Sequence, residues 1–339
     1  MLKNKITIDE IAKIAQVSKS TVSKALNNRA DVSETTKQKI LDIVQKHEYT
    51  PNVFGKGLKS KKTNNVGVIF TREDRPLSNN PFFSRVLEGI EAELALNGYN
   101  LVLNIIPEND ITILPRMIRE QQVDGLILMG VFLNEFVERL KQLNIPVVQV
   151  DPKTDIPEIS QVSIDNVHGG YVATQYLVKM GHKRIGFVSG DFKRLSFKQR
   201  LEGYKKALIS NGIRPDEKLV RASGIEDGYQ LVKSLMEQEH PTALIASNDL
   251  NALHGYNALN DLQLKIPDDI SIVGFDDIWL SEIATPPLTT IRVYKEELGS
   301  IGVRTLLRSI SGEIDKPVTT IIPIRLVERK SVMKCPVLV

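Results

Sequence analysis

The sequence predicts a small all-helical head followed by an α/β body built on parallel sheets. Three observations support this fold class. Residues 1–49 follow helical periodicity with capping residues at its breaks, whereas from residue 66 onward short apolar runs alternate with amphipathic stretches. The charge is also unevenly divided: residues 1–65 hold 13 Lys and Arg against 6 Asp and Glu, a net charge of +7, and residues 66–339 hold 31 against 35, a net charge of −4. A basic head on a mildly acidic body predicts that the head meets a polyanion.

The composition excludes several classes of protein. With 339 residues, 42% hydrophobic and 25% charged, the chain has the make-up of a globular protein of two or three domains. No run approaches the roughly 18 apolar residues of a membrane span, and the first residues do not resemble an export signal. The single cysteine, Cys335, permits no intrachain disulfide. We therefore expect a cytoplasmic protein with no membrane partner.

Three short helices are predicted in the head. Thr7 and Glu10 have the spacing of a capping box at the start of the first helix, Ser18 is a good N-cap for the second, and Ser33 for a third that runs to about Glu48. A tight turn between the first two helices predicts a helix-turn-helix unit. Any small three-helix bundle gives a similar pattern, so this periodicity alone leaves DNA binding open.

The second helix has one narrow apolar side, formed by Val22, Ala25 and Leu26. Its other side is polar and consists of Lys19, Ser20, Ser23, Lys24 and Asn27. In a helix-turn-helix unit the second helix enters the major groove, where such side chains meet base edges and phosphates. The connector at residues 50–65 holds Pro51, two glycines and four lysines, which by itself indicates a flexible basic linker.

In the body, polar residues follow the predicted strands. Asp151 ends PVVQVD, Asn248 follows TALIAS, and Asp276 follows IVGF. Ser196 and Arg200 lie in the stretch RLSFKQR, after the run RIGFVSG. Ligands of open α/β sheets bind beyond the carboxyl ends of the strands, so these residues are candidates for a binding site. The alternative for each Asp or Asn is that it caps the next helix.

Two further residues are candidates for the rim of such a site. Arg72 follows the run VGVIF, and Phe82 lies in the stretch Asn80–Phe83, where it can stack on a ligand. No dinucleotide-binding loop, Walker loop or nucleophile elbow is present in the sequence, and the five histidines have no metal-ligand spacing. We therefore expect a protein that is not an enzyme and has neither a metal site nor a cofactor.

Several motifs resemble the lactose/galactose repressor (LacI/GalR) family. These motifs are VSKSTVSKALNN, the segment HEYTPNVFGKGLKSKKTNNVGVIF, SIDNVHGGYVATQYLVKMGHKRIGFVSG, ASNDLNAL, IVGFDD and PPLTTI. They cover nearly the whole chain in the family's order. The resemblance implies a helix-turn-helix domain at residues 1–49, a hinge at 50–65 and a body at 66–339 made of two doubly wound lobes, similar to periplasmic binding proteins. It implies a first lobe at about 66–161 plus 293–325, a second at about 162–291, and a chain that finishes in the first lobe.

By the same resemblance, Lys19 and Ser20 read bases in the operator. The remaining DNA-binding positions that it implies are Thr7, Ser18, Thr21, Ser23, Lys24, Asn27 and Asn52, together with Leu58 as the hinge leucine that enters the minor groove. Many members have arginine where this chain has Lys24, and lysine lacks the bidentate fork that reads guanine. Gly55 and Gly57 weaken the hinge as a helix, which suits a segment that folds on DNA.

The family's effector contacts correspond here to Asp151, Ser196, Arg200, Asn248 and Asp276. An arginine fork with carboxylates and an amide matches the many hydroxyl groups of a sugar. We therefore expect a transcription regulator, and specifically a repressor, that binds near-palindromic operator DNA as a homodimer. We expect it to respond to a small-molecule effector, a sugar or sugar derivative. The tail shows no leucine heptads, so we expect no tetramer-forming extension.

Two alternatives stay open from the sequence. One is a global regulator of the same family that is controlled by a purine or by a partner protein. The other is a secreted solute-binding protein, which shares the two-lobed body but needs an export signal and lacks a basic head.

Overall fold

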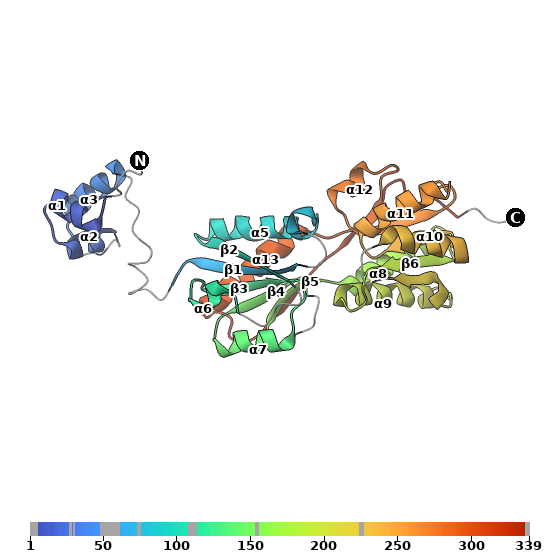
Figure 1. The fold of residues 1–339 in the computed structure, drawn as a ribbon, viewed down its shortest axis with the longest axis horizontal. Coiled ribbons are helices and arrows are strands. Elements are labelled where there is room, and N and C mark those ends of the chain that lie inside the picture. Colours follow the sequence, from blue (N-terminus) through green and yellow to red (C-terminus); the bar gives the residue numbers. More distant parts are fainter. Residues whose placement is uncertain are drawn as a thin grey trace. The chain divides into compact units, whose positions relative to one another are not determined.

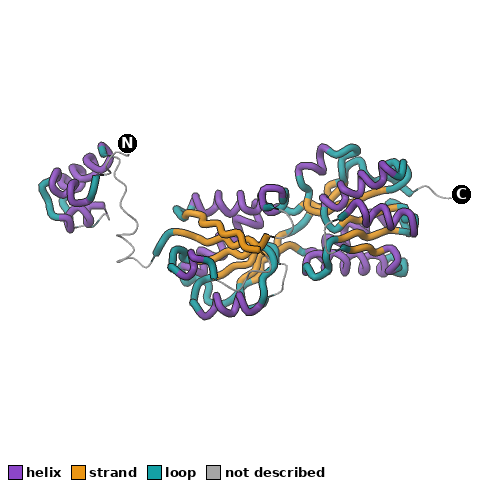
Figure 2. Tube along the Cα trace, in the orientation of Figure 1, coloured by secondary structure: helices purple, strands orange, loops and turns teal. Residues whose placement is uncertain are grey.

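The computed structural model describes residues 6–26, 29, 31–47, 62–72, 76–107, 114–152, 156–223 and 227–335. The chain divides into two compact units, residues 1–63 and 64–339, and each is described by itself (Figures 1 and 2). The first unit is helical, and the second is an α/β unit with two separate sheets.

The first unit contains the three helices that the capping residues predict. They are α1 (Ile8–Ala15), α2 (Lys19–Leu26) and α3 (Glu34–Lys46). Thr7 and Glu10 form the expected capping box at α1, the Ser18 hydroxyl accepts a hydrogen bond from the Thr21 amide at 3.1 Å, and Ser33 caps α3. Apolar side chains from all three helices form one small core: Ile11, Ala12, Ala15, Val22, Ala25, Val32 and Ile40.

The first sheet of the body has six parallel strands in the order β11-β5-β4-β3-β1-β2. The strands are β1 (Asn65–Arg72), β2 (Asn100–Pro107), β3 (Gly125–Met129), β4 (Val147–Val150), β5 (Ser160–Ile164) and β11 (Thr319–Ile322). Strand order reverses at β1, which pairs with both β2 and β3, so this is a doubly wound sheet. Sheets of this kind bind ligands in a crevice at the carboxyl ends of their strands.

The second sheet has the order β12-β10-β9-β8-β6-β7. Its strands are β6 (Ile185–Ser189), β7 (Val220–Ala222), β8 (Ala243–Ala246), β9 (Ser271–Asp276), β10 (Thr289–Arg292) and β12 (Arg325–Val327). All pairs are parallel except β10 with β12. Strand order reverses at β6, which pairs with both β7 and β8.

Helices cover both faces of each sheet, as the near-continuous apolar strands predict (Figure 1). On the first sheet, α5 (Phe83–Leu96) and α13 (Lys295–Ile310) pack together on one face, and α6 (Arg116–Arg119) and α7 (Asn134–Gln142) lie on the other. On the second sheet, α8 (Asn166–Lys179) and α9 (Leu195–Ser210) cover one face, opposite α10 (Gly228–Glu239) and α11 (Asp249–Asp261). Three short helical segments complete the unit: η1 (Leu77–Asn79), η2 (Glu217–Leu219) and α12 (Trp279–Ile283).

The chain passes between the two lobes three times, and this corrects the predicted boundaries. The passages lie between β5 and α8, between β10 and α13, and between β11 and β12. The first passage follows Ile164, close to the boundary at about residue 162 that the resemblance implies. The last described residues lie in the second lobe, not the first as expected, because β12 pairs antiparallel with β10 and covers an edge that would otherwise be open. The amide of Cys335 then donates to the Met180 carbonyl at 2.8 Å.

Candidate functional site

The polar side of α2 is exposed, as its periodicity predicts. Val22 and Ala25 are buried, while Lys19, Ser20, Ser23 and Lys24 are exposed and Thr21 is half-buried. Hydroxyl and ammonium groups therefore project from one side of a short helix whose opposite side is fixed in a core. This is the arrangement that a helix needs in order to enter a groove of DNA.

Each lysine of α2 meets a carboxylate in the same unit. The Lys19 ammonium pairs with Asp9 of α1, and the Lys24 ammonium lies 2.6 Å from a carboxylate oxygen of Asp31 in the loop before α3. The hydrogen bond from Lys24 holds the pKa of Asp31 below its usual value. Phosphate groups of DNA would have to replace these two carboxylates as partners of the lysines.

The other predicted DNA-binding residues differ in what the structure shows of them. Thr7 and Ser18 act as helix caps in the free unit: the Thr7 hydroxyl accepts from the Glu10 amide at 3.3 Å, as Ser18 does from Thr21. Asn27, Asn52 and Leu58 lie outside the described residues.

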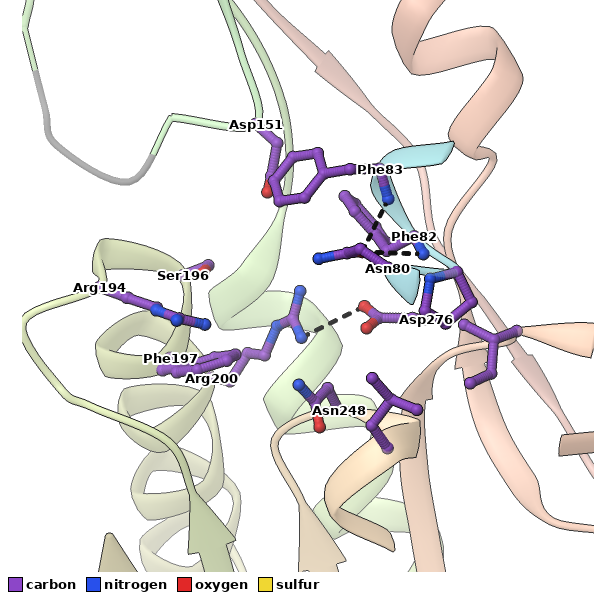
Figure 3. A pocket seen from close by; sticks show the side chains of 13 residues that line it. Asn80, Phe82, Phe83, Asp151, Arg194, Ser196, Phe197, Arg200, Asn248 and Asp276 are labelled. Atoms are coloured by element: carbon purple, nitrogen blue, oxygen red, sulfur yellow. Dashed lines mark hydrogen bonds and ion pairs between the residues drawn. The ribbon is translucent and has the colours of Figure 1, made fainter. Parts of the chain in front are cut away.

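A pocket lies between the two lobes of the body, where strand ends from both sheets meet (Figure 3). It contains about 510 Å³ of unfilled space, part of it open to solvent. The residues that line it are Asn80, Pro81, Phe82, Phe83 and Asp151 from the first lobe, and Arg194, Ser196, Phe197, Arg200, Asn248, Leu250, Asp276 and Ile278 from the second. Six of the seven predicted effector-binding residues are therefore brought together: Phe82, Asp151, Ser196, Arg200, Asn248 and Asp276.

Arg200 occupies the centre of the second lobe's side of this pocket. It projects from α9, only 4% of its surface is exposed, and its guanidinium donates to the Asn166 side chain at 2.9 Å and to the Ser247 carbonyl at 2.5 Å. The guanidinium also lies 3.6 Å from the centre of the Phe275 ring. These contacts fix a planar donor fork in one orientation before any ligand arrives.

Asp276 faces Arg200 from the end of β9, with 3.3 Å between a guanidinium nitrogen and carboxylate Oδ1 (Figure 3). Although Oδ1 is buried and lies near this cation, it accepts no hydrogen bond within the described residues. Burial raises the pKa of Asp276 to about 7, and the nearby charge of Arg200 opposes that rise. The pocket thus offers a carboxyl group that changes charge near neutral pH.

A second carboxylate, Asp249, is fully buried at the start of α11. It accepts hydrogen bonds from the hydroxyls of Thr290 at 2.6 Å and Ser281 at 2.7 Å and from the Ile278 amide at 2.9 Å. Burial raises the pKa of Asp249 to about 6, against the effect of these donors. Asp249 therefore ties α11, α12 and β10 together behind the pocket wall and does not line the pocket.

Asn248 fits both interpretations of a polar residue after a strand. Its side chain accepts from the Asn251 amide at 2.9 Å and so caps α11, and the same residue lines the pocket. Asp151 also lines the pocket and has a left-handed backbone with φ of +50°, a conformation that Asp tolerates better than most residues.

Sequence reasoning missed several lining residues that lie beside predicted ones. Arg194 is the residue before α9 and Phe197 lies in its first turn next to Ser196, while Phe83 follows Phe82, with the two rings 5.2 Å apart. The available signal was the spacing of Arg194, Phe197 and Arg200 on one side of the helix. Arg72 ends β1, and its side chain lies outside the described part of the structure.

Neither a metal site nor a membrane span is found among the described residues. We found no group of three or more His, Cys, Asp or Glu side chains arranged to hold a metal ion. In the same ranges, no helix combines the length and the apolar character needed to cross a membrane.

Two family models match the chain. The model described as "Bacterial regulatory proteins, lacI family" matches residues 7–52, and the model described as "Periplasmic binding protein-like domain" matches residues 174–332. The chain is 31% identical over 336 residues to the HTH-type transcriptional regulator DegA of Bacillus subtilis (strain 168), with 96% of this chain and 98% of that protein covered.

Two solved structures are similar over almost the whole chain. The lac repressor dimer bound to operator and the anti-inducer ONPF has a TM-score of 0.86 and 26% identity, covering 97% of this chain and 100% of that one. The complex of the transcriptional regulator CelR with cellobiose has a TM-score of 0.74 and 28% identity, covering 96% of this chain and 99% of that one.

Proposed function

Because the chain belongs to the LacI family of bacterial regulatory proteins, we propose that it represses transcription as a homodimer on a near-palindromic operator and that a carbohydrate bound between its lobes controls this action. DNA-binding regulation is the common activity of the family. The similar lac repressor structure is a dimer bound to operator, which supports a dimer here, and two copies of α2 would then read two half-sites. Since its target is DNA, we place its action in the cytoplasm.

The observation that carries the effector proposal is the convergence of Arg200, Asp276, Asn248, Asp151 and Ser196 in one pocket. A fixed guanidinium donates, carboxylates accept and an amide does both, so the vicinal hydroxyls of a sugar can be bonded in defined directions. The similar CelR structure contains cellobiose, which supports the same class of ligand here. We assign the pocket a binding role, because its fixed guanidinium, carboxylates and amide match a ligand with many hydroxyl groups.

Control of DNA binding follows from where these residues are attached. Phe82 and Asp151 belong to the first lobe and Arg200 and Asp276 to the second, so a ligand that touches both sets favours one separation of the lobes. A ligand that binds one lobe arrangement more tightly shifts the population toward it. We infer that this shift decides whether the two hinge segments of a dimer, with Leu58, fold together on DNA.

A purine is the second candidate effector. Three phenylalanines, Phe82, Phe83 and Phe197, line the pocket, and aromatic rings stack on purines as well as on sugar faces. Ser223 stands where purine- and sugar-binding relatives often have another ring, so neither ligand has a stacking partner at that position. We place the purine second because the similar CelR structure contains a sugar, cellobiose.

The direct test uses the full chain. Duplexes are selected from a randomised pool, and the affinity for the selected duplex is measured by gel shift with and without glucose, ribose, cellobiose, hypoxanthine or guanine. We expect a near-palindromic duplex to be preferred and a sugar to change its affinity. Leu58→Ala should weaken operator binding, whereas Leu96→Ala, at an exposed position in the body, should not.

The outcomes separate the alternatives. No preference over random duplex contradicts a sequence-specific regulator. A response to a purine alone would make a purine the effector in place of a sugar. A selected duplex whose affinity changes with none of the probes favours control by a partner protein.

A further inference from the structure

The turn after β9 has an unusual backbone. Asp276 has a φ of +106° and Asp277 a φ of +53°, both in the region that L-residues rarely adopt. Such conformations persist only where the surroundings hold them in place. Some contact must therefore hold the backbone of these two successive aspartates, the first of which lines the pocket.

Both carbonyl groups of this turn point at one side chain. The Lys295 ammonium donates to the Asp276 carbonyl at 2.6 Å and to the Asp277 carbonyl at 3.0 Å, and its third donor reaches the Val293 carbonyl at 3.2 Å. Only 6% of Lys295 is exposed. All three protons of the ammonium therefore form hydrogen bonds with main-chain oxygens, so every donor of this buried lysine has an acceptor.

Lys295 reaches the turn from the other lobe. It is the first residue of α13, which packs on β3, β4 and β5 of the first sheet, whereas Asp276 ends β9 of the second sheet. The chain passes between the lobes just before it, after Arg292. The ammonium therefore ties the start of a first-lobe helix to the end of a second-lobe strand.

The charge of Lys295 also acts on the Asp276 carboxylate. Four charged groups face this carboxylate: Arg200 from α9, Asp249 from α11, Asp151 after β4, and Lys295 from α13. Burial and the two carboxylates favour the neutral form of Asp276, and Arg200 and Lys295 favour the ionised form. Burial likewise lowers the pKa of Lys295, and the neighbouring carboxylates oppose that change.

We propose that Lys295 is a positioning residue for the effector site. It bridges the connection between the two lobes and holds residues 276 and 277 in their left-handed turn. It thereby directs the Asp276 carboxylate at Arg200. It acts through Asp276 and is not itself among the lining residues of the pocket. Its attachment to α13 means that movement of the lobes about their connections changes the hold on this turn. The effector role of Asp276 rests on the proposed function, but the positioning itself is a property of the chain without ligand.

The test measures the ionisation of Asp276 without any ligand. The full chain is labelled with aspartate carrying ¹³C at its side-chain carboxyl, and the carboxyl signals are followed by NMR from pH 5 to 9. Asp276→Asn identifies the signal of Asp276 by its loss. In Lys295→Met the midpoint should move to higher pH by about one unit, because an attractive cation is removed. Lys295→Arg should keep the wild-type midpoint, and so should Lys316→Met, which removes an exposed lysine far along the chain.

A midpoint in Lys295→Met equal to that of the wild type would overturn the proposal, since removing the ammonium and its three hydrogen bonds would then leave the Asp276 carboxyl unaffected. If the Met variant does not fold, Lys295→Gln takes its place: it keeps a donor for the carbonyls and removes the charge, so the Asp276 midpoint should still move to higher pH, and an unchanged midpoint would overturn the proposal. The ligand screen of the previous section is a separate measurement: its failure contradicts the effector pocket and leaves the Asp276 midpoint to decide the role of Lys295.

Discussion

The head and the body of this protein use charged side chains in opposite ways. In the head, the side chains of Lys19 and Lys24 are 67% and 48% exposed, and each has a carboxylate partner at the surface. In the body, the side chains of Arg200 and Asp276 are only 5% and 11% exposed, and they face each other in a pocket. Water and salt screen the first kind of pair, while the low dielectric around the second makes each charge depend on its partner.

This difference matches what each region has to bind. Exposed lysines exchange partners at little cost, which suits a polyanion whose counterions are released on binding. Buried charges are fixed in direction and costly to leave unpaired, which suits discrimination among small ligands. If the comparison holds, substitutions in the body should change stability and pH dependence, and substitutions in the head should change DNA binding and its salt dependence.

The largest effect should come from Arg200→Ala. This change leaves Asp276 buried without its cation, so we expect the free energy of unfolding of the body to fall by about 3–5 kcal/mol in urea denaturation at pH 8. Arg304→Ala is the matched control, because Arg304 pairs with Glu93 at 2.8 Å but is 60% exposed. It should cost less than about 1 kcal/mol. Equal losses of unfolding free energy in the two variants would contradict the distinction between buried and exposed charge pairs.

The next effect concerns pH. Because the folded pKa of Asp276 is raised to about 7, above the value of an unfolded chain, the native state binds the extra proton and loses stability as pH rises toward 7. Asp276→Asn does not titrate. Its free energy of unfolding relative to wild type should therefore increase between pH 5 and 7, by about 2 kcal/mol.

Asp31→Asn in the head provides the contrast for that measurement. Lys24 lowers the pKa of Asp31, so any contribution of Asp31 to the stability of the head has the opposite pH dependence and is lost as pH falls. A relative stability of Asp276→Asn that does not change with pH would show that Asp276 ionises normally in the fold.

A smaller effect is expected for Lys24→Ala. Removing one phosphate contact should reduce the slope of log affinity against log salt by about 1, measured by fluorescence anisotropy on the selected duplex. Stability should stay within about 0.5 kcal/mol of wild type, because the side chain is exposed. An unchanged slope would remove Lys24 from the phosphate contacts.

The smallest effect should be that of Asp31→Asn on DNA. This change frees Lys24 from its carboxylate and removes a negative charge near the phosphates, so affinity for random-sequence duplex should rise about two- to fivefold. Gln38→Glu, on the exposed side of α3, adds a negative charge without touching Lys24 and should not raise it. A loss of affinity in Asp31→Asn would mean that Asp31 orients Lys24 for DNA.

Much of the fold was predictable from local pattern. The capping residues Thr7, Ser18 and Ser33 gave the starts of the three head helices, and the fold class and the resemblance to the LacI/GalR family are confirmed. Strands β5, β7, β10, β11 and β12 were not among the predicted strands. Their sequences SQVSI, VRA, TTIR, TTII and RLV mix polar with apolar residues, so they lack the near-continuous apolar runs that made the equally short β4 and β8 recognisable.

The candidate site was predictable in part, for a similar reason. Asp151, Asn248 and Asp276 follow recognisable strands, so their place at one edge follows from strand direction. Arg194 and Phe83 were missed because their lining position depends on how α9 and α5 face the other lobe. Their roles, like those of the other lining residues, stay predictions until ligands are tested.

The sequence by itself determined which residues lie on the outer side of α2 and which stand at strand ends, because periodicity and capping are properties of neighbouring residues. Only the tertiary structure decided that Arg200 meets Asp276, that Lys295 of one lobe holds a turn of the other, and that the last described strand, β12, lies in the second lobe. Those pairings join residues far apart in the chain. They depend on the order of strands in two sheets and on burial, and no local pattern specifies either.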